Sequence, residues 1–365
     1  MELTKAPFRN ALLDTAHANV GPGWFTSVMG TGVFAIGLQI APIHFALFHA
    51  LAVAVFALDV ALFVGFAAML AWHYLVEPRA FAASLDDSVV AQLWGAPPMA
   101  AFTVAVGLLL IGGTLGFGAA GVAIAQVLFV AGVVLSVFSA AVVPFRMFTQ
   151  HDLAPERAFG SWLLPVVPPI VASVPAALLS ATWPAALRSS MLVLAYALLG
   201  IGIFLAAILI VVFYSRLLYA KVPESALVTT TWIVVGPLGQ SVAGIIALGA
   251  VAQTVWPEIG TALYDAGIAY GLLVWGFGVY WLGMAIALTI RGALKHLPFT
   301  LGWWAFTFPV GTLMSGSYAL FHATHAAIFE VAGYALLALL AAMWSLVGWR
   351  SVHHSKRAYA AIANA

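Results

Sequence analysis

The sequence has no cysteine and few charged residues. Of its 365 residues, 7% are Asp, Glu, Lys or Arg, while 64% are hydrophobic. The absence of cysteine excludes disulfides, thiolate metal sites and cysteine nucleophiles. The net charge of +1 argues against a nucleic-acid partner. A soluble protein of this length cannot bury so much apolar surface, so the composition predicts a protein whose solvent includes lipid.

Long apolar runs predict an all-α polytopic membrane protein with ten spans. A spanning helix needs about 20 mainly apolar residues. This window gives the ranges 24–41, 46–75, 98–118, 121–145, 162–181, 190–215, 231–253, 263–290, 301–322 and 325–349. The short loops predict one transmembrane domain, residues 23–350, between a cytoplasmic N-terminal segment, 1–22, and a cytoplasmic tail, 351–365.

The distribution of cations tests this topology independently. Lys and Arg concentrate in cytoplasmic loops of membrane proteins. With ten spans and the N-terminus inside, twelve of the thirteen cations fall inside, and only Arg188 falls outside. Adding or removing a central span would destroy this asymmetry. The charges therefore predict an even number of spans, with both termini on the cytoplasmic side of the cell membrane.

Tryptophan and proline recur with a common period. Five tryptophans lie 68 to 71 residues apart, each at the start of an odd-numbered span: Trp24, Trp94, Trp162, Trp232 and Trp303. An aromatic belt at the membrane surface is the alternative explanation of this pattern. Every odd span also carries proline at or inside its start, and the helix-kinking candidates are Pro165, Pro168, Pro237 and Pro309.

The two sets of spans are expected to occupy different places. A kinked helix frees backbone groups that lipid cannot satisfy, so the odd spans should be inner and the even spans lipid-facing. All five hairpins run in the same direction, and parallel repeats are related by an axis along the membrane normal. The sequence thus predicts five hairpin repeats, with an inner ring of five kinked helices around a central pore.

The polar residues of the inner spans indicate what could cross such a pore. Between their ends these spans hold no Asp, Glu, Lys, Arg or His. A cation pathway more often carries acidic side chains, whereas hydroxyl groups and freed backbone N–H groups can solvate an anion. The expected pore-lining residues are Gly30, Thr31, Thr103, Ser173, Gln240, Ser241, Thr312 and Ser315.

Phe308 is a candidate gate on the ninth span. Helical spacing places Phe308, Thr312 and Ser315 on one face, so a bulky ring beside Pro309 could close the axis. The alternative is that Phe308 is one of 24 phenylalanines that pack between helices.

Four motifs resemble those of a known family. They are GPGWFTSVMGTGVFAIG (21–37), SWLLPVVPPIVA (161–172), VGPLGQSVAG (235–244) and WWAFTFPVGT (303–312). These stretches resemble the signatures of the tellurite-resistance/C4-dicarboxylate transporter family, which includes malate permeases, sulfite exporters and slow-type anion channels. The resemblance spans the whole chain.

The resemblance implies ten spans around a quasi-five-fold pore, often in a homotrimer. It also implies that a phenylalanine on the ninth span occludes the pore, which selects Phe308, with Phe306 as the fallback. The expected ligands are small inorganic or organic anions, with no cofactor. Neither the resemblance nor the residues choose among malate, sulfite, chloride and tellurite.

Two carboxylates support an alternative mechanism. Asp59 lies in the middle of the second span, and Glu330 lies near the start of the tenth. An intramembrane carboxylate is a functional candidate by default. If either were proton-linked, the protein would be a secondary carrier for C4-dicarboxylates, sulfite or tellurite-type oxyanions. The simpler interpretation is that each carboxyl group ties an outer helix to an inner one.

The remaining candidate residues give weaker evidence about function. His44, His49, His322 and His325 cluster near the expected outer face, but their spacing does not fix a metal site. Arg146, Arg157 and His151 could raise the anion concentration at the inner mouth or simply follow the positive-inside rule. No convergent acids, bases or metal ligands indicate an enzyme. An anion channel or uniporter is the leading hypothesis, ahead of a carrier and of a scaffold without transport.

Overall fold

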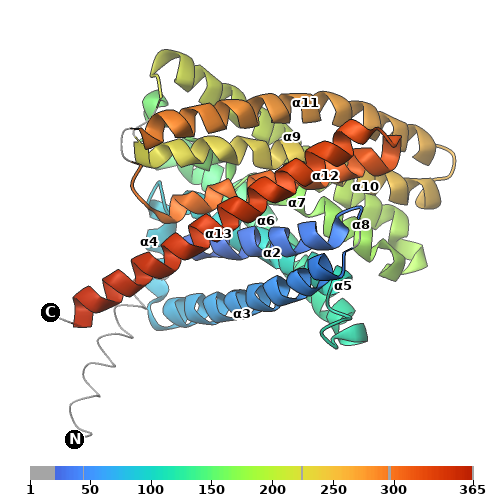
Figure 1. Cartoon of the computed structure of the whole chain (residues 1–365), viewed down its shortest axis with the longest axis horizontal. Helices are drawn as coiled ribbons and strands as arrows, with labels where there is room; N and C mark the ends of the chain where they lie inside the picture. The colour runs from blue at the N-terminus through green and yellow to red at the C-terminus, as the bar shows by residue number, and fades with distance from the viewer. Residues whose placement is uncertain (1–20, 44, 223–224, 295–296, 364–365) are drawn as a thin grey trace, which may run out of the picture.

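The computed structural model describes residues 21–43, 45–222, 225–294 and 297–363, and every regular element among them is helical. The predicted N-terminal segment, 1–22, therefore lies almost wholly outside the described residues, as does His44. Figure 1 shows a bundle of long helices lying side by side, with the C-terminal end of α13 extending beyond it.

Eight helical stretches of the described chain are long and apolar enough to cross a membrane. They are Pro22–Ile40, Ala46–Val76, Ala91–Leu110, Gly118–Thr149, Ala185–Tyr219, Leu227–Val255, Gly260–Ala293 and Ala327–Lys356. Each coincides with one of the predicted spans. The chain is therefore a polytopic helical protein, as the composition predicted.

Two predicted spans are not single long apolar helices. The range 162–181 is divided among η4 (Gly160–Leu163), α7 (Pro168–Val171) and α8 (Ser173–Leu179). The range 301–322 is divided between η8 (Leu301–Phe306) and α12 (Phe308–Thr324). Both ranges contain proline inside the apolar run, and proline removes a hydrogen-bond donor that a continuous helix requires.

Burial separates the eight stretches into two classes. Three are buried over 78–83% of their most apolar window, namely those that contain α2 (Phe25–Ile40), α5 (Ala96–Leu110) and α10 (Val235–Val255). The other five are buried over only 22–33%; they contain α3 (Ala46–Val76), α6 (Gly118–Thr149), α9 (Arg188–Tyr219), α11 (Gly260–Ala293) and α13 (Ala327–Ala363). For these eight, the prediction of inner proline-bearing helices and outer proline-poor helices is confirmed.

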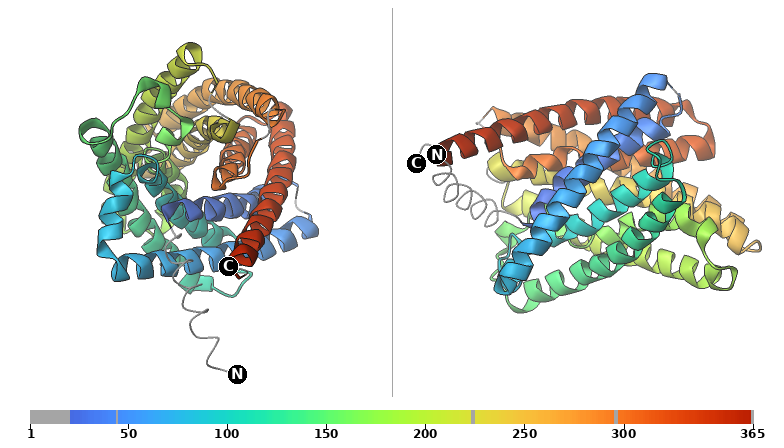
Figure 2. Two further views of the ribbon diagram at one scale, coloured as in Figure 1. Left: turned by 90° about the vertical axis from the view of Figure 1, so that its left-hand side faces the viewer. Right: turned by 90° about the horizontal axis from the view of Figure 1, so that it is seen from below.

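The inner segments contact one another in a closed sequence. α2 packs against α5, α5 against α7 and α8, these against α10, α10 against α12, and α12 against α2 again. Each inner segment also packs against the long helix that follows it in the chain. Figure 2 (left) shows α2 and α12 inside the bundle, with α3, α11 and α13 around the outside.

The inner segments begin in a common way. Each starts with a turn of 3₁₀-helix before the α-helix: η1 (Pro22–Trp24), η2 (Ala91–Gly95), η4, η7 (Ser225–Val234) and η8. Pro309 occupies the first turn of α12, where its missing N–H costs no helical hydrogen bond. The proline there joins two helix types, whereas the sequence suggested a kink inside one helix.

The broken segment around Pro165 uses a neighbouring helix to satisfy its backbone. The carbonyl of Pro165 would normally accept from the N–H of residue 169, but that residue is a proline. The hydroxyl of Ser139, on α6, donates to this carbonyl at 2.9 Å. An outer helix thus supplies the donor that the inner segment lacks, as apolar surroundings require.

Candidate functional site

Two cavities of about 360 Å³ each lie along the inner segments. We call them the N-side cavity, lined by the starts of the inner segments, and the C-side cavity, lined by their later turns. The N-side cavity contacts Met29, Met99, Val167 and Pro237, and the C-side cavity contacts Val33, Phe102, Val171 and Gln240. On each segment the change from one cavity to the other occurs within one helical turn.

Among the residues that the structure describes, Phe308 is the one that lines both cavities. Its side chain is 3% exposed, so it is enclosed by other groups although it borders two hollow spaces. On each of the other four inner segments, one turn separates the residues that line the N-side cavity from those that line the C-side cavity. Phe308 occupies the corresponding position on α12. The ring therefore lies between the two cavities.

Local packing fixes the position of Phe308. Thr307 precedes α12 with its hydroxyl donating to the carbonyl of Trp304 at 2.7 Å. A Cβ on Gly30 would collide with the Thr307 hydroxyl, and a Cβ on Gly311 would lie 2.5 Å from a methyl of Val33. The missing side chains of these two glycines let α2 approach η8 and α12 on either side of Phe308.

Phe306, the fallback gate, occupies a different environment. It is 3% exposed, and its ring centre lies 4.9 Å from that of Trp232 and 5.6 Å from that of Trp303. It lines neither cavity. Its role in the structure is aromatic packing between η7 and η8.

Of the eight residues predicted to line a pore, three lie on the wall of the C-side cavity: Thr103, Gln240 and Ser315. The other five line neither cavity: Gly30, Thr31, Ser173, Ser241 and Thr312. Two of the latter tie inner helices to outer ones. Thr31 accepts a hydrogen bond from the indole of Trp344 at 3.1 Å, and Ser241 accepts one from the hydroxyl of Tyr270 at 2.9 Å.

The hydroxyl hydrogens of Thr103 and Ser315, on the C-side wall, are already used. Thr103 donates to the carbonyl of Ala100 at 2.9 Å, and Ser315 donates to that of Gly311 at 3.0 Å. Serine and threonine in helices commonly bond to the preceding turn in this way. The proposal that these two hydroxyls donate to an anion stays a prediction, since in the structure both donate to backbone carbonyls.

The two intramembrane carboxylates lie behind the wall. Asp59 is fully buried on α3, and its carboxylate lies against the backbone of Gly32, with no other polar partner among the described residues. A Cβ on Gly32 would lie 2.6 Å from Asp59 Oδ2 and 3.0 Å from the Cβ of Thr103. Glu330 is half-buried at the start of α13, near Tyr318 and Tyr334. Neither carboxylate lines a cavity.

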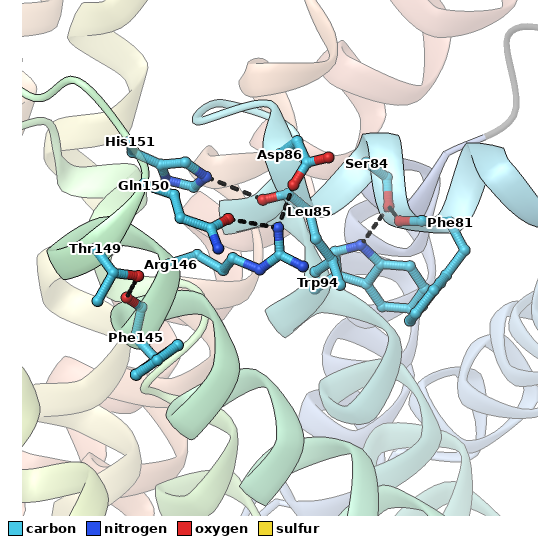
Figure 3. Close-up of polar contacts among 10 residues, drawn as sticks. All are labelled: Phe81, Ser84, Leu85, Asp86, Trp94, Phe145, Arg146, Thr149, Gln150 and His151. Carbon is cyan, nitrogen blue, oxygen red and sulfur yellow. Dashed lines mark hydrogen bonds and ion pairs between the residues drawn. The ribbon is translucent and has the colours of Figure 1, made fainter.

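Two of the side chains predicted at the inner mouth, Arg146 and His151, bind to neighbouring protein groups. Arg146 forms an ion pair with Asp86, at the end of the short helix α4 (Pro78–Asp86), and its guanidinium also donates to Gln150 at 2.6 Å (Figure 3). His151 is hydrogen-bonded to the carbonyl of Leu85 at 2.9 Å (Figure 3). The charge of Arg146 is thus compensated. Neither Arg146, His151 nor Arg157 lines the two cavities.

The predicted histidine cluster does not form a metal site among the described residues, which contain no grouping of three or more His, Asp or Glu side chains suited to a metal ion. His49 bonds to the amide oxygen of Gln39 at 2.9 Å. His322 lines the far end of the C-side cavity. The sequence places His322 near the outer face, and its position on this cavity depends on how α12 is rotated.

Comparison with known proteins finds relatives that are named as transporters. The profile of the SLAC1 family, described as voltage-dependent anion channel, matches residues 19–352. The sulfite efflux pump SSU1 of Arthroderma otae is 31% identical over 93% of this chain and 92% of its own. An uncharacterized transporter of Methanocaldococcus jannaschii, MJ0576, is 28% identical over 90% of this chain and 91% of its own. The malic acid transport protein of Schizosaccharomyces pombe is 21% identical over 89% of this chain and 76% of its own.

Proposed function

The chain belongs to the voltage-dependent anion channel family, and from this membership we propose that it is an anion channel or uniporter whose pathway is closed by Phe308. The pathway runs through the N-side cavity, past Phe308, into the C-side cavity. One observation carries the proposal: two cavities follow the same inner segments and share a single lining residue, Phe308. A bulky apolar ring between two spaces can block conduction by filling and dewetting the passage.

The proposed architecture completes the predicted ring. The broken segment Gly160–Leu179 and the pair η8–α12 would each cross the membrane beside α2, α5 and α10, giving ten spans in five hairpins. The contact order of the inner segments, which returns from α12 to α2, supports this arrangement. We further propose that both termini are cytoplasmic in the cell membrane and that the protein is a homotrimer, which the family resemblance implies.

The absence of fixed charge on the walls favours rapid passage. Within the described part of the chain, no Asp, Glu, Lys or Arg lines either cavity. Strong binding sites slow conduction, whereas weak ones release the ion readily. The inner segments therefore suit a permeant that is held weakly and briefly.

The alternative function is a secondary carrier, in which anion transport could be coupled to the binding of a proton. It is favoured by the buried carboxylate of Asp59, which lies directly behind the wall residue Thr103. The printed names of the relatives, a sulfite efflux pump and a malic acid transport protein, suggest sulfite and C4-dicarboxylates as anions to test for either mechanism.

Purified protein in liposomes tests the proposed function. The vesicles are loaded with the potassium salt of chloride, nitrate, sulfite or malate, and a potassium ionophore lets the cation follow the anion. Under these conditions wild-type protein should release the anion faster than protein-free vesicles do. Flux that continues to rise with anion concentration supports a channel, whereas saturation with stimulation by a proton gradient supports the carrier. Absence of anion flux under either condition, in wild type and in folded Phe308→Ala alike, would contradict both functions.

A further inference from the structure

The C-side cavity surrounds its contents with an environment that disfavours double charge. The titratable groups on its wall are Tyr318 and His322, and His322 lies at the far end. An anion beside Phe308 therefore has no cationic side chain to balance it. Because the electrostatic cost of desolvation rises with the square of the charge, a dianion costs about four times as much as a monoanion of the same size. The wall thus selects against doubly charged anions.

One wall residue has unused hydrogen-bonding capacity for an anion. Gln240 is 7% exposed on α10, and its amide makes no hydrogen bond within the described part of the chain. An unpaired amide offers two N–H donors and one carbonyl acceptor. An anion in the cavity that accepts from this amide gains a charge-assisted hydrogen bond. Gln240 is therefore the best donor on this wall.

The rest of the wall offers mainly acceptors. Thr103 and Ser315 have given their hydrogens to their own helices, which leaves oxygen lone pairs on the cavity side. Tyr318 also lines the cavity, but its hydroxyl oxygen is buried without a partner and is not accessible from the cavity. A bare anion would be repelled by the lone pairs, whereas a ligand that keeps an acidic hydrogen could donate to them.

We infer that the C-side cavity binds a monoanionic oxyacid that retains one proton, such as hydrogensulfite, and that Gln240 is the residue that selects it. The inference rests on the proposed function, since it assumes that the cavity lies on the anion pathway. The Gln240 amide donates to the charged oxygen of the anion, and the hydroxyl of the anion donates to Thr103 or Ser315. The proton then crosses the membrane on the permeant, and no protein side chain has to carry it.

The first test is the pH dependence of sulfite transport by wild-type protein in liposomes at fixed total sulfite. The rate, after subtraction of protein-free vesicles, should follow the hydrogensulfite concentration and fall as pH rises through the second ionisation of sulfite. Chloride transport over the same range should stay constant. A sulfite rate that follows the dianion or the total concentration would overturn the inference.

Protein groups near the cavity could mimic this result by titrating themselves. They are Tyr318 and His322 on the wall, Tyr270 bonded to Ser241 beside Gln240, Asp59 behind Thr103, and Glu330 near Tyr318. If the proton resides on the permeant, His322→Gln, Asp59→Asn and Glu330→Gln should leave the midpoint of the sulfite profile in place. A midpoint that moves with any of these variants assigns the titration to the protein and overturns the inference.

The second test replaces the selecting residue. Gln240→Met keeps the length of the side chain but removes its donors, and it should lower the ratio of sulfite to chloride transport about tenfold at acidic pH, the effect of losing one hydrogen bond to a charged group. Gln253→Met, at an exposed position of the same helix, is the matched control and should leave the ratio unchanged.

The outcomes separate the two proposals. If no variant and no wild-type sample moves any anion, the proposed function itself is wrong. If chloride and sulfite both cross but Gln240→Met leaves their ratio unchanged, anion transport stands and the assignment of Gln240 is wrong.

Discussion

Phe308 and Phe306 are separated by a single residue, yet their surroundings give them different roles. Phe308 borders two cavities, whereas Phe306 packs against Trp232 and Trp303. Both rings are 3% exposed, so burial alone does not distinguish them. The distinction depends on what each ring touches, and it leads to opposite expectations for truncation.

Phe306→Ala should destabilise the protein without opening a pathway. Removing a buried aromatic ring costs about 3–5 kcal/mol, because the surrounding indoles cannot fill the space. The thermal unfolding midpoint of the detergent-solubilised variant should fall clearly below that of wild type, and anion flux per folded protein should not rise. Increased flux with an unchanged midpoint would make Phe306 the gate.

Asp59→Asn should retain anion flux if the protein is a channel. The carboxylate lies behind Gly32 and Thr103 and does not line a cavity, so the isosteric amide should leave the wall unchanged. Anion flux in liposomes, measured with and without an imposed proton gradient, checks this. Loss of gradient-stimulated transport in Asp59→Asn, with basal flux preserved, would favour the carrier.

At the residue scale, a motif indicated which side chain to examine, whereas helix rotation decided which polar residues border a cavity. The motif WWAFTFPVGT, with Phe308 beside Pro309, drew attention to Phe308, which lies between the two cavities. Thr103 and Thr31 look alike in the sequence, but Thr103 borders a cavity and Thr31 contacts Trp344. Only the rotation of each helix about its axis decides this, and a uniformly apolar helix carries no polar stripe to reveal it.

At the scale of elements, close packing of α10 on α12 holds the inner segments together. Gly239 lies against the backbone of α12, and a Cβ there would come within 2.5 Å of Leu313 Cα. Backbone atoms cannot move aside as a flexible side chain can. This contact therefore fixes the distance between two helices that line both cavities.

Gly239→Ala should force α10 away from α12 and lower stability by about 1–3 kcal/mol, the usual cost of overpacking. Gly276→Ala is the matched control, since a Cβ on this exposed residue of α11 meets nothing within 4 Å. Thermal unfolding and the yield of monodisperse protein should fall for the first variant only. Equal behaviour of the two variants would show that the contact is unimportant.

The prolines show what sequence patterns can and cannot predict about an element. Their recurrence correctly separated α2, α5 and α10 from the exposed helices that follow them. Their local effect differs from the prediction, because Pro309 lies in the first turn of α12, after a 3₁₀ segment. Proline is compatible with a kink or with a helix start, and only the conformation of the preceding residues distinguishes them.

At the scale of the whole molecule, the orientation of the chain rests on the distribution of cations. Because the chain has no native cysteine, single cysteines can report each side without background. Ser355→Cys on α13 and Thr261→Cys on α11 are both at exposed positions. In intact cells, a membrane-impermeant maleimide should label Thr261→Cys, and it should label Ser355→Cys only after permeabilisation. The reverse pattern would invert the proposed topology.

Composition predicted the long apolar helices of the whole molecule, because a lipid environment requires them. The orientation inferred from the flanking cations stays a prediction. Eight predicted spans correspond to such helices, while the ranges 162–181 and 301–322 are interrupted. The subdivision of the pathway into two cavities was not predictable. It arises from contacts among segments far apart in the sequence, such as Gly30 with Thr307.

The central claim is that Phe308 closes a passage between the two cavities, and planar-bilayer recording of Phe308→Ala beside wild type tests it most directly. The account predicts large anion-selective currents in chloride, nitrate and sulfite from the variant, small currents from wild type, and thermal unfolding that shows both to be folded. Phe204→Ala, at a ring 74% exposed on α9, is the control and should behave as wild type. A folded Phe308→Ala protein with currents no larger than those of wild type would contradict the account.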